Sequence, residues 1–405
     1  MKRSTERILT THAGSLSRPP DLLALNGARA LGEKVDEGAY ARCLAGAVAD
    51  VVRKQRELGI DIPDDGEFGK PMATNYDYGA WWNYAFARLE GFAPAETVPE
   101  SAHKKSSVAA LALTTMNNRR DWQKFGEFYQ DPESSGTLLG SAARRRGRRP
   151  VCTGPIKYAG HAALKADIDN LKRALAARNE EGFMCSIAPG SFARGEDLHY
   201  KTEEEFVFAV AEAMREEYRA IVDAGIVLQL DDPSLPDNWD MINPEPPLAE
   251  FKKFERARIE ALNHALRGLP PERIRYHICW GSWHGPHTTD IPLADIVDLV
   301  LAVDAGAYSV EAGNVRHEHE WRVWQDAKLP EGKLLIPGVV SHATNIVEHP
   351  RVVADRIVRY ARIVGRENVI AGSDCGFGGR IHPQIAWAKL AALAEGAKIA
   401  TRELW

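Results

Sequence analysis

Short β-prone runs alternate with helical segments along most of the 405-residue chain. The run at residues 226–230, for example, follows a segment with helical spacing of apolar residues at 202–224 and ends in a polar turn. Such alternation predicts a mostly parallel sheet covered by helices. Polar residues gather where the strands end, and a TIM barrel places its active site there, so we expect a (β/α)8 TIM barrel. An open doubly wound sheet also explains the alternation, but it brings fewer strand ends to one point.

The sequence contains nine β-prone runs, and a TIM barrel has eight strands, so we expect one run to lie outside the barrel. The runs are residues 8–12, 60–63, 150–155, 182–190, 226–230, 272–276, 307–310, 333–340 and 368–372. The alternation lapses between about residues 68 and 149. We therefore expect one catalytic domain over residues 1–405 with this less regular aromatic and basic segment inserted.

The inserted segment holds two unusual clusters. Its aromatic residues are Tyr76, Tyr78, Trp81, Trp82, Tyr84 and Phe86, and its basic run is at 144–149. Core packing is the favoured interpretation of the aromatic cluster, ahead of a lid or an oligomer contact. A solvated surface loop is favoured for the basic run, ahead of an anion-binding patch.

Composition excludes several classes of protein. A net charge of −5 gives no reason to expect nucleic acid as a partner. No apolar stretch reaches membrane-spanning length, and residues 1–7 lack a signal-peptide core. The five scattered cysteines do not form a disulfide framework, which fits a reducing cytoplasm. We expect a cytoplasmic enzyme without nucleic-acid or membrane partners, and a homo-oligomer is compatible with the composition.

Two side chains that can bind a metal, His277 and Cys279, are two residues apart at the end of one predicted strand. Residues i and i+2 of a strand point the same way, so an imidazole nitrogen and a thiolate are aimed at one point. A pair of this kind is by itself more often core filling. However, two other predicted strands also lead to a possible ligand with a glycine one or two residues later, Glu311 and Cys375. Together the four residues predict a zinc site with nitrogen, sulfur and oxygen ligands.

The order of motifs resembles that in the C-terminal catalytic barrel of cobalamin-independent methionine synthase. These motifs are TTHAGS at 10–15, GE at 66–67, TGP at 153–155, QLDDP at 229–233, HIC at 277–279, Glu311 and DCG at 374–376. The runs CWG at 279–281, GPH at 285–287 and AGSDCGFG at 371–378 look closer to a short single-barrel branch that includes epoxyalkane:coenzyme M transferase. The resemblance covers nearly the whole chain, without the N-terminal barrel of the long synthases.

The resemblance implies a zinc-dependent S-alkyltransferase, in which a small thiol such as homocysteine or coenzyme M is held as a thiolate and attacks an alkyl donor. Zinc with one neutral histidine and three anionic ligands carries a formal charge of −1, which suits a thiolate better than a bound hydroxide. Free thiols have a pKa of about 8.5, so coordination secures the nucleophile at neutral pH. The resemblance makes Glu311 the ligand that yields to the incoming sulfur.

The resemblance also implies how the rest of the thiol is held. Residues matching Gly14 and Ser15 bind the carboxylate of homocysteine, and those matching Glu67 and Asp231 bind its ammonium. A strand-end turn and a structural salt bridge are the plain alternatives for these two pairs. His342 follows a strand end and is a candidate to protonate a leaving group. Trp280 is a candidate wall of the alkyl-donor pocket, and packing under the loop explains it equally well.

Other functions stay open at the level of sequence. Methionine synthesis proper needs a methylfolate or methylcorrinoid donor, and no convincing folate-binding set is present. A zinc hydrolase or lyase ranks lower, because two thiolates and a carboxylate make a bound water less acidic. A protein that keeps zinc only for stability is the third alternative.

Overall fold

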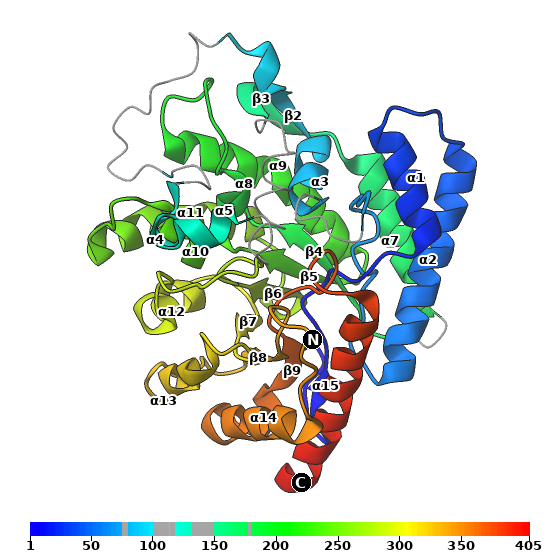
Figure 1. Cartoon of the computed structure of the whole chain (residues 1–405), viewed down its shortest axis with the longest axis vertical. Coiled ribbons are helices and arrows are strands. Elements are labelled where there is room, and N and C mark those ends of the chain that lie inside the picture. Colours follow the sequence, from blue (N-terminus) through cyan, green and yellow to red (C-terminus); the bar gives the residue numbers. More distant parts are fainter. Residues whose placement is uncertain (75–79, 100–112, 114–117, 132–149, 177–179) are drawn as a thin grey trace.

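The computed structural model describes residues 1–74, 80–99, 113, 118–131, 150–176 and 180–405. Its centre is a curled, seven-stranded parallel sheet with the order β1-β9-β8-β7-β6-β5-β4 (Figure 1). The strands are β1 (Leu9–Thr10), β4 (Phe183–Ile187), β5 (Val227–Asp231), β6 (Ile274–His277), β7 (Ala307–Glu311), β8 (Leu334–Val340) and β9 (Ile370–Ser373). Neighbouring strands pair in parallel throughout, as the alternation of strands and helices predicts.

Residues 60–63 lie between β1 and β4, the two edge strands of the sheet. The backbone N–H groups of Asp61 and Ile62 donate to the Thr10 carbonyl at 3.1 Å, and the Phe183 N–H donates to the Pro63 carbonyl at 3.1 Å. Pro63 has no N–H to donate, so this stretch cannot form a regular ladder. It nevertheless joins the two edges, which gives the eight positions of the expected TIM barrel.

Helices surround the curled sheet (Figure 1). The longer ones are α1 (Pro20–Ala30), α2 (Glu37–Leu58), α7 (His161–Ala176), α9 (Glu203–Asp223), α11 (Leu248–Leu266), α12 (Leu293–Leu301), α14 (Pro350–Val364) and α15 (Pro383–Leu404). Short ones are α8 (Pro189–Phe192), α10 (Ser234–Met241) and α13 (Val323–Asp326). Helix α9 begins where the sequence predicts it: Thr202 caps it by accepting from the Glu205 N–H at 3.1 Å, and Glu205 accepts from the Lys201 N–H at 2.9 Å.

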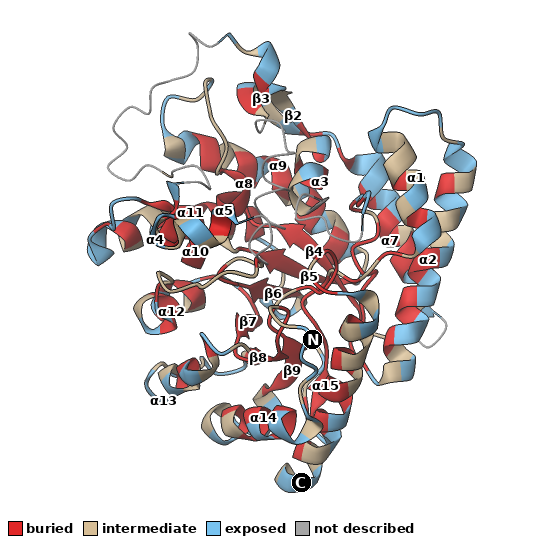
Figure 2. Cartoon of the chain, in the orientation of Figure 1, coloured by how far each residue is buried: buried red, intermediate tan, exposed pale blue. Residues whose placement is uncertain are grey.

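The apolar interior has two layers. A smaller cluster, which includes Phe183, Cys185, Val227 and Ile336, forms where alternate side chains of the strands meet each other. A larger cluster joins the other face of the strands to the helices. Figure 2 shows the strands buried and the outer faces of the helices exposed. Within the described ranges, no helix is both long enough and apolar enough to cross a bilayer.

The ninth predicted run is not part of the barrel. It forms β3 (Val151–Tyr158), which pairs antiparallel with β2 (Leu89–Ala93) in a separate two-stranded sheet. Helices α3 (Ala80–Arg88), α4 (Arg120–Lys124) and α5 (Gly126–Gln130) precede β3, together with the 3₁₀ turn η1 (Ala95–Thr97).

The aromatic residues of the inserted segment are only partly described. Tyr84 is buried, and its hydroxyl accepts a hydrogen bond from the Ile187 N–H at 2.7 Å. The ring of Phe86 contacts that of Phe192 in α8. Core packing therefore accounts for these two side chains. Tyr76, Tyr78 and the basic run at 144–149 lie outside the described residues.

Candidate active site at the carboxyl ends of the strands

Three predicted metal ligands meet at the carboxyl ends of the strands. One possible ligand atom from each of His277, Cys279 and Cys375 lies within 4.8 Å of the others. His277 is the last residue of β6, and Cys375 follows the end of β9, which is separated from β6 by β7 and β8. The two sulfur atoms are 3.9 Å apart and both cysteines are free. Side chains distant in sequence thus share one small volume, as the strand-end argument predicts.

The hydrogen bonds and charges of this triad are compatible with a bound cation. His277 Nδ1 lies 3.0 Å from Ser309 Oγ, and within the described ranges Nε2 has no hydrogen-bond partner although it is buried. The hydrogen bond between the sulfurs and burial raise the pKa of Cys279, while the same bond and His277 hold that of Cys375 well below its usual range. These contacts favour the thiol form at Cys279 and the thiolate form at Cys375. An unpartnered imidazole nitrogen beside two sulfurs fits a zinc-type ion.

Glu311 lies beside the triad but is not one of the mutually close set. Its Oε1 accepts from the Trp280 backbone N–H at 3.2 Å, and its Oε2 accepts from the Asn314 amide at 2.6 Å. The same amide also donates to Asp374, whose carboxylate accepts from two backbone N–H groups of the loop after β7. In this arrangement the Glu311 carboxylate is held by the protein, and its role as a fourth ligand stays a prediction.

A second buried cluster comprises Glu67, Cys185 and Asp231, with one possible ligand atom from each again within 4.8 Å of the others. Asp231 on β5 is the register partner of His277 on β6, so the two clusters adjoin. Burial and the neighbouring Glu67 raise the pKa of Asp231 to about 6. Glu67 has a backbone φ of 60°, an uncommon conformation for a residue with a side chain.

Gly14 and Ser15 connect the two clusters. Gly14 has φ 114°, and a Cβ at this position would lie 2.4 Å from Cys185 Sγ and 2.6 Å from Glu67 Oε1. Its N–H donates to His12 Nδ1 at 3.1 Å. The Ser15 carbonyl accepts from the N–H groups of residues 377 and 378, just after Cys375. The turn at Gly14 and Ser15 therefore contacts both the acidic cluster and the loop that carries a triad cysteine.

Comparison of the sequence with known proteins finds related enzymes. The sequence is 25% identical over 378 residues to 2-hydroxypropyl-CoM lyase from Xanthobacter autotrophicus, covering 82% of this chain and 95% of that enzyme. It is 23% identical over 396 residues to methionine synthase from Thermococcus kodakarensis, covering 98% and 94%. The chain is a homologue of these enzymes. No family model matches it.

Solved structures give the same fold. A B12-independent methionine synthase from Shewanella superposes with a TM-score of 0.67 at 19% identity, covering 98% of this chain and 99% of that one. The corresponding protein from Listeria monocytogenes superposes with a TM-score of 0.63 at 16% identity, covering 98% and 99%. The TIM barrel and the resemblance to the cobalamin-independent methionine synthase family, with its coenzyme M branch, are thereby confirmed.

Two further predicted residues lie near the triad. His342 is buried, and within the described ranges neither of its ring nitrogens has a hydrogen-bond partner. Burial lowers its pKa to about 3, so its imidazole is neutral at pH 7. Trp280 is also buried: its ring stacks on His317 at 3.9 Å, and its indole N–H donates to the Ile291 carbonyl at 2.7 Å. The roles predicted for both residues stay predictions.

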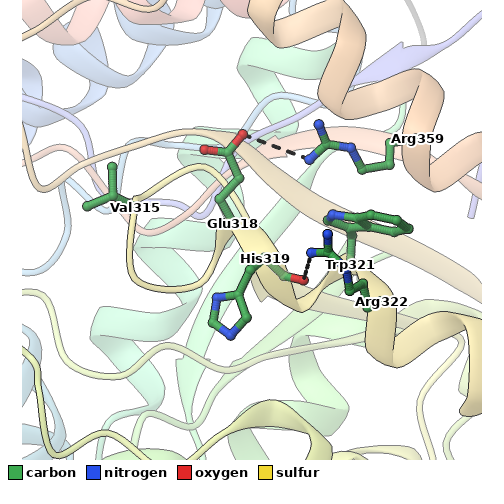
Figure 3. A pocket seen from close by; sticks show the side chains of 6 residues that line it. All are labelled: Val315, Glu318, His319, Trp321, Arg322 and Arg359. Carbon is green, nitrogen blue, oxygen red and sulfur yellow. Dashed lines mark hydrogen bonds and ion pairs between the residues drawn. The ribbon is translucent and has the colours of Figure 1, made fainter.

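A hollow on the surface lies apart from these residues (Figure 3). It is formed by the segment around the 3₁₀ helix η5 (Glu318–Arg322) and by α14, where Arg359 lies 3.9 Å from Glu318. Its lining residues are Val315, Glu318, His319, Trp321, Arg322 and Arg359. None of the predicted site residues lines it.

Sequence reasoning missed four residues of the site: Lys70, Trp81, Cys185 and Ser309. Ser309 had a signal, because it precedes Glu311 by two residues on the same strand and so faces the same side. Cys185 shares a strand face with Phe183, which is a core residue, so its spacing gave no signal. Lys70 lies three residues after Glu67, and its Nζ is 3.2 Å from Glu67 Oε2. Trp81 reaches Asp231 from α3 and had no local signal.

Proposed function

We propose that this protein is a zinc-dependent transferase that moves an alkyl or methyl group onto the sulfur of a small thiol. The observation that carries the proposal is the convergence of His277, Cys279 and Cys375, with the buried Nε2 of His277 unpartnered within the described ranges. The homologues support the same reading, since they are named as methionine synthase and 2-hydroxypropyl-CoM lyase.

The residues that would hold zinc are His277, Cys279 and Cys375, with Glu311 as the ligand that yields. When bound there, zinc would lower the pKa of a substrate thiol and so supply a thiolate nucleophile at neutral pH. Ser309 would fix the imidazole of His277 so that Nε2 faces the ion. The Glu311 carboxylate accepts hydrogen bonds from Asn314 and from the Trp280 N–H. It would therefore stay hydrogen-bonded if a substrate sulfur replaced it as a ligand.

His342 would act on the leaving group. Its imidazole is neutral at pH 7 because burial lowers its pKa to about 3, and a neutral ring carries one N–H. If the alkyl donor is an epoxide, its carbon–oxygen bond breaks and negative charge develops on the oxygen. The N–H of His342 can donate a hydrogen bond to that oxygen. The leaving oxygen takes up one proton in all, which balances the proton that the substrate thiol loses when it becomes a thiolate.

Metal analysis of single cysteine variants tests the proposal. We expect about one zinc per chain in the purified wild-type protein and loss of zinc and thiol-dependent turnover in Cys279→Ser and Cys375→Ser. The matched control is Cys43→Ser, because Cys43 is a free, half-buried cysteine on α2 and lies outside both clusters. Full zinc content and turnover in both site variants would refute the proposal, provided the control behaves as wild type.

Methionine synthesis proper is the second candidate, because methionine synthases match 98% of this chain. A screen of donors against a fixed thiol separates the two. Transfer from a methylfolate or a methylcorrinoid would identify a methionine synthase. Transfer from an epoxide or another activated alkyl compound, with no transfer from either methyl donor, would identify the wider alkyltransferase activity.

A further inference from the structure

A lysine with a fully buried side chain lies on α15. The Lys389 side chain is 0% exposed, and lysine is almost never buried to this extent unless it is paired. Its ammonium donates to the Ile346 carbonyl and, at 2.9 Å, to the Glu348 carboxylate. Both acceptors belong to residues 341–349, the segment that joins β8 to α14 and that we call the His342 loop. At Lys389, α15 therefore holds this loop.

Glu348 connects this lysine to the beginning of the loop. Its second carboxylate oxygen, Oε1, accepts from the Ser341 backbone N–H at 2.7 Å, and Ser341 directly follows the last residue of β8. The Ser341 hydroxyl oxygen accepts in turn from the Ala343 N–H at 3.1 Å. The Glu348 side chain is only 9% exposed, so solvent screens its contacts little. One carboxylate thus connects the backbone next to His342 to α15.

The imidazole of His342 is not held by a hydrogen bond of its own. The ring is buried, and within the described ranges neither of its nitrogens has a partner. The backbone of the loop does make contacts: Nε2 of His284 lies 3.3 Å from the His342 carbonyl. The loop also begins beside the end of β9, because the Asp374 N–H donates to the Val340 carbonyl at 3.0 Å. The placement of the imidazole thus depends on how the backbone of residues 341–343 is held.

The tip of the loop contributes little to this placement. Residues 345–347 are exposed, and Ile346 is 75% exposed, so apolar packing does not anchor the tip. A buried ion pair is also weak evidence for stability, because the desolvation of two charges offsets their attraction. A buried polar network whose groups are satisfied does, however, impose one defined arrangement on the groups that it joins. The pair of Lys389 and Glu348 is therefore best explained by the geometry that it gives the loop.

We propose that Lys389 is a positioning residue, which acts through Glu348 to hold the His342 loop and so keeps the imidazole of His342 in place at the carboxyl ends of the strands. The proposal rests on the function proposed above only for what His342 does there. Loss of the contact should impair the step that needs His342 and spare the metal site, whose predicted residues lie at the ends of β6, β7 and β9.

Hydrogen–deuterium exchange of the zinc-loaded protein tests whether Lys389 holds the loop. Lys389→Met removes the donor and nearly keeps the side-chain length, so we expect the amides of residues 341–343 to exchange about tenfold faster than in wild type. Exchange at residues 371–378 and the zinc content should stay as in wild type. The matched control is Leu390→Ala, because Leu390 is equally buried on α15 and its side chain cannot hydrogen-bond to the loop. Unchanged exchange at residues 341–343, or an equal change in the control or at residues 371–378, would overturn the proposal.

The kinetics of the same variant show whether the lysine acts through His342. Lys389→Met should lower kcat for alkyl transfer about tenfold and leave KM for the thiol nearly unchanged, because the thiol is bound at the metal site. His342→Gln should lower kcat in the wild-type background but lower it by less than about twofold further in the Lys389→Met background. Two losses in kcat that multiply in the double variant, or a change in KM alone, would contradict the proposal.

A second variant covers a failure of Lys389→Met to fold, since that substitution leaves Glu348 buried without its cation. The double variant Lys389→Met/Glu348→Met removes both charges, and we expect it to show the same faster exchange and the same loss of kcat. If the wild-type protein transfers no alkyl group to any thiol, the proposed function fails. Exchange at residues 341–343 then decides alone whether Lys389 holds the loop.

Discussion

Substitution of Gly14 by alanine should destabilise the protein strongly, because two independent costs add. The backbone at Gly14 has φ 114°, which a residue with a side chain adopts at a cost of about 1–3 kcal/mol. The new Cβ would also lie 2.4 Å from Cys185 Sγ and 2.6 Å from Glu67 Oε1, and overpacking in a buried site costs about 1–3 kcal/mol more. We therefore expect a loss of about 2–6 kcal/mol in the free energy of unfolding, measured by urea titration with tryptophan fluorescence.

Two other glycines separate the two costs. Gly225 has φ 81° and no atom within 4 Å of a built Cβ, so Gly225→Ala should pay only the backbone cost. Gly46 lies on the exposed side of α2 with open space around its Cβ, so Gly46→Ala should stabilise by about 0.5–1 kcal/mol. Adding Cys185→Ala to Gly14→Ala removes the nearest clashing atom and should recover part of the loss. If Gly14→Ala costs no more than Gly225→Ala, the close approach of the Gly14 turn to the acidic cluster is refuted.

Three further predictions concern the surroundings of the site and the core. Ser309→Ala should weaken zinc binding about tenfold in chelator competition, because it removes the partner that orients the metal-facing imidazole; unchanged affinity would contradict this. His317→Phe keeps a ring but leaves Glu320 buried without its cation and leaves Asp290 with His287 alone. Urea unfolding should therefore show a loss of about 3–5 kcal/mol in the free energy of unfolding, and a loss under about 1 kcal/mol would be inconsistent with the ion pairs. Burial raises the pKa of Glu255 from 4.5 to about 8. Between these two pH values the folded state binds a proton that the unfolded state lacks, so the free energy of unfolding falls as pH rises from 4.5 to about 8. Glu255→Gln should therefore gain stability relative to wild type between pH 5 and pH 8, and parallel pH profiles would show that this carboxyl ionises normally.

The barrel could be predicted because its signal is local and repeated. Each strand is a short apolar run followed by a polar turn, and the alternation with helices leaves few topologies. The two ambiguities have physical causes. Residues 60–63 contain Pro63, so they take a barrel position without forming a regular strand. The β3 run looks like any other strand in sequence, and only its antiparallel partner β2, beyond a long insertion, removes it from the barrel.

The metal triad could be predicted for a similar reason. His277 and Cys279 obey the two-residue period of a strand, and parallel strands end at the same edge, where Cys375 also lies. The partners of the acidic cluster could not be predicted. Lys70 and Trp81 reach it from a turn and from an inserted helix, and their placement depends on tertiary packing that no local pattern encodes. The sequence therefore predicts that the triad side chains lie together, and only the structure shows which side chains surround the acidic cluster.

X-ray absorption at the zinc edge of the wild-type protein tests the central claim most directly. We expect two sulfur neighbours at about 2.3 Å with nitrogen and oxygen completing four-fold coordination. Addition of homocysteine or coenzyme M, whichever the enzyme accepts, should raise the number of sulfur neighbours to three at the expense of one oxygen. A zinc ion bound without sulfur, or a sulfur count that no thiol changes, would contradict the account of how this chain binds and activates its substrate.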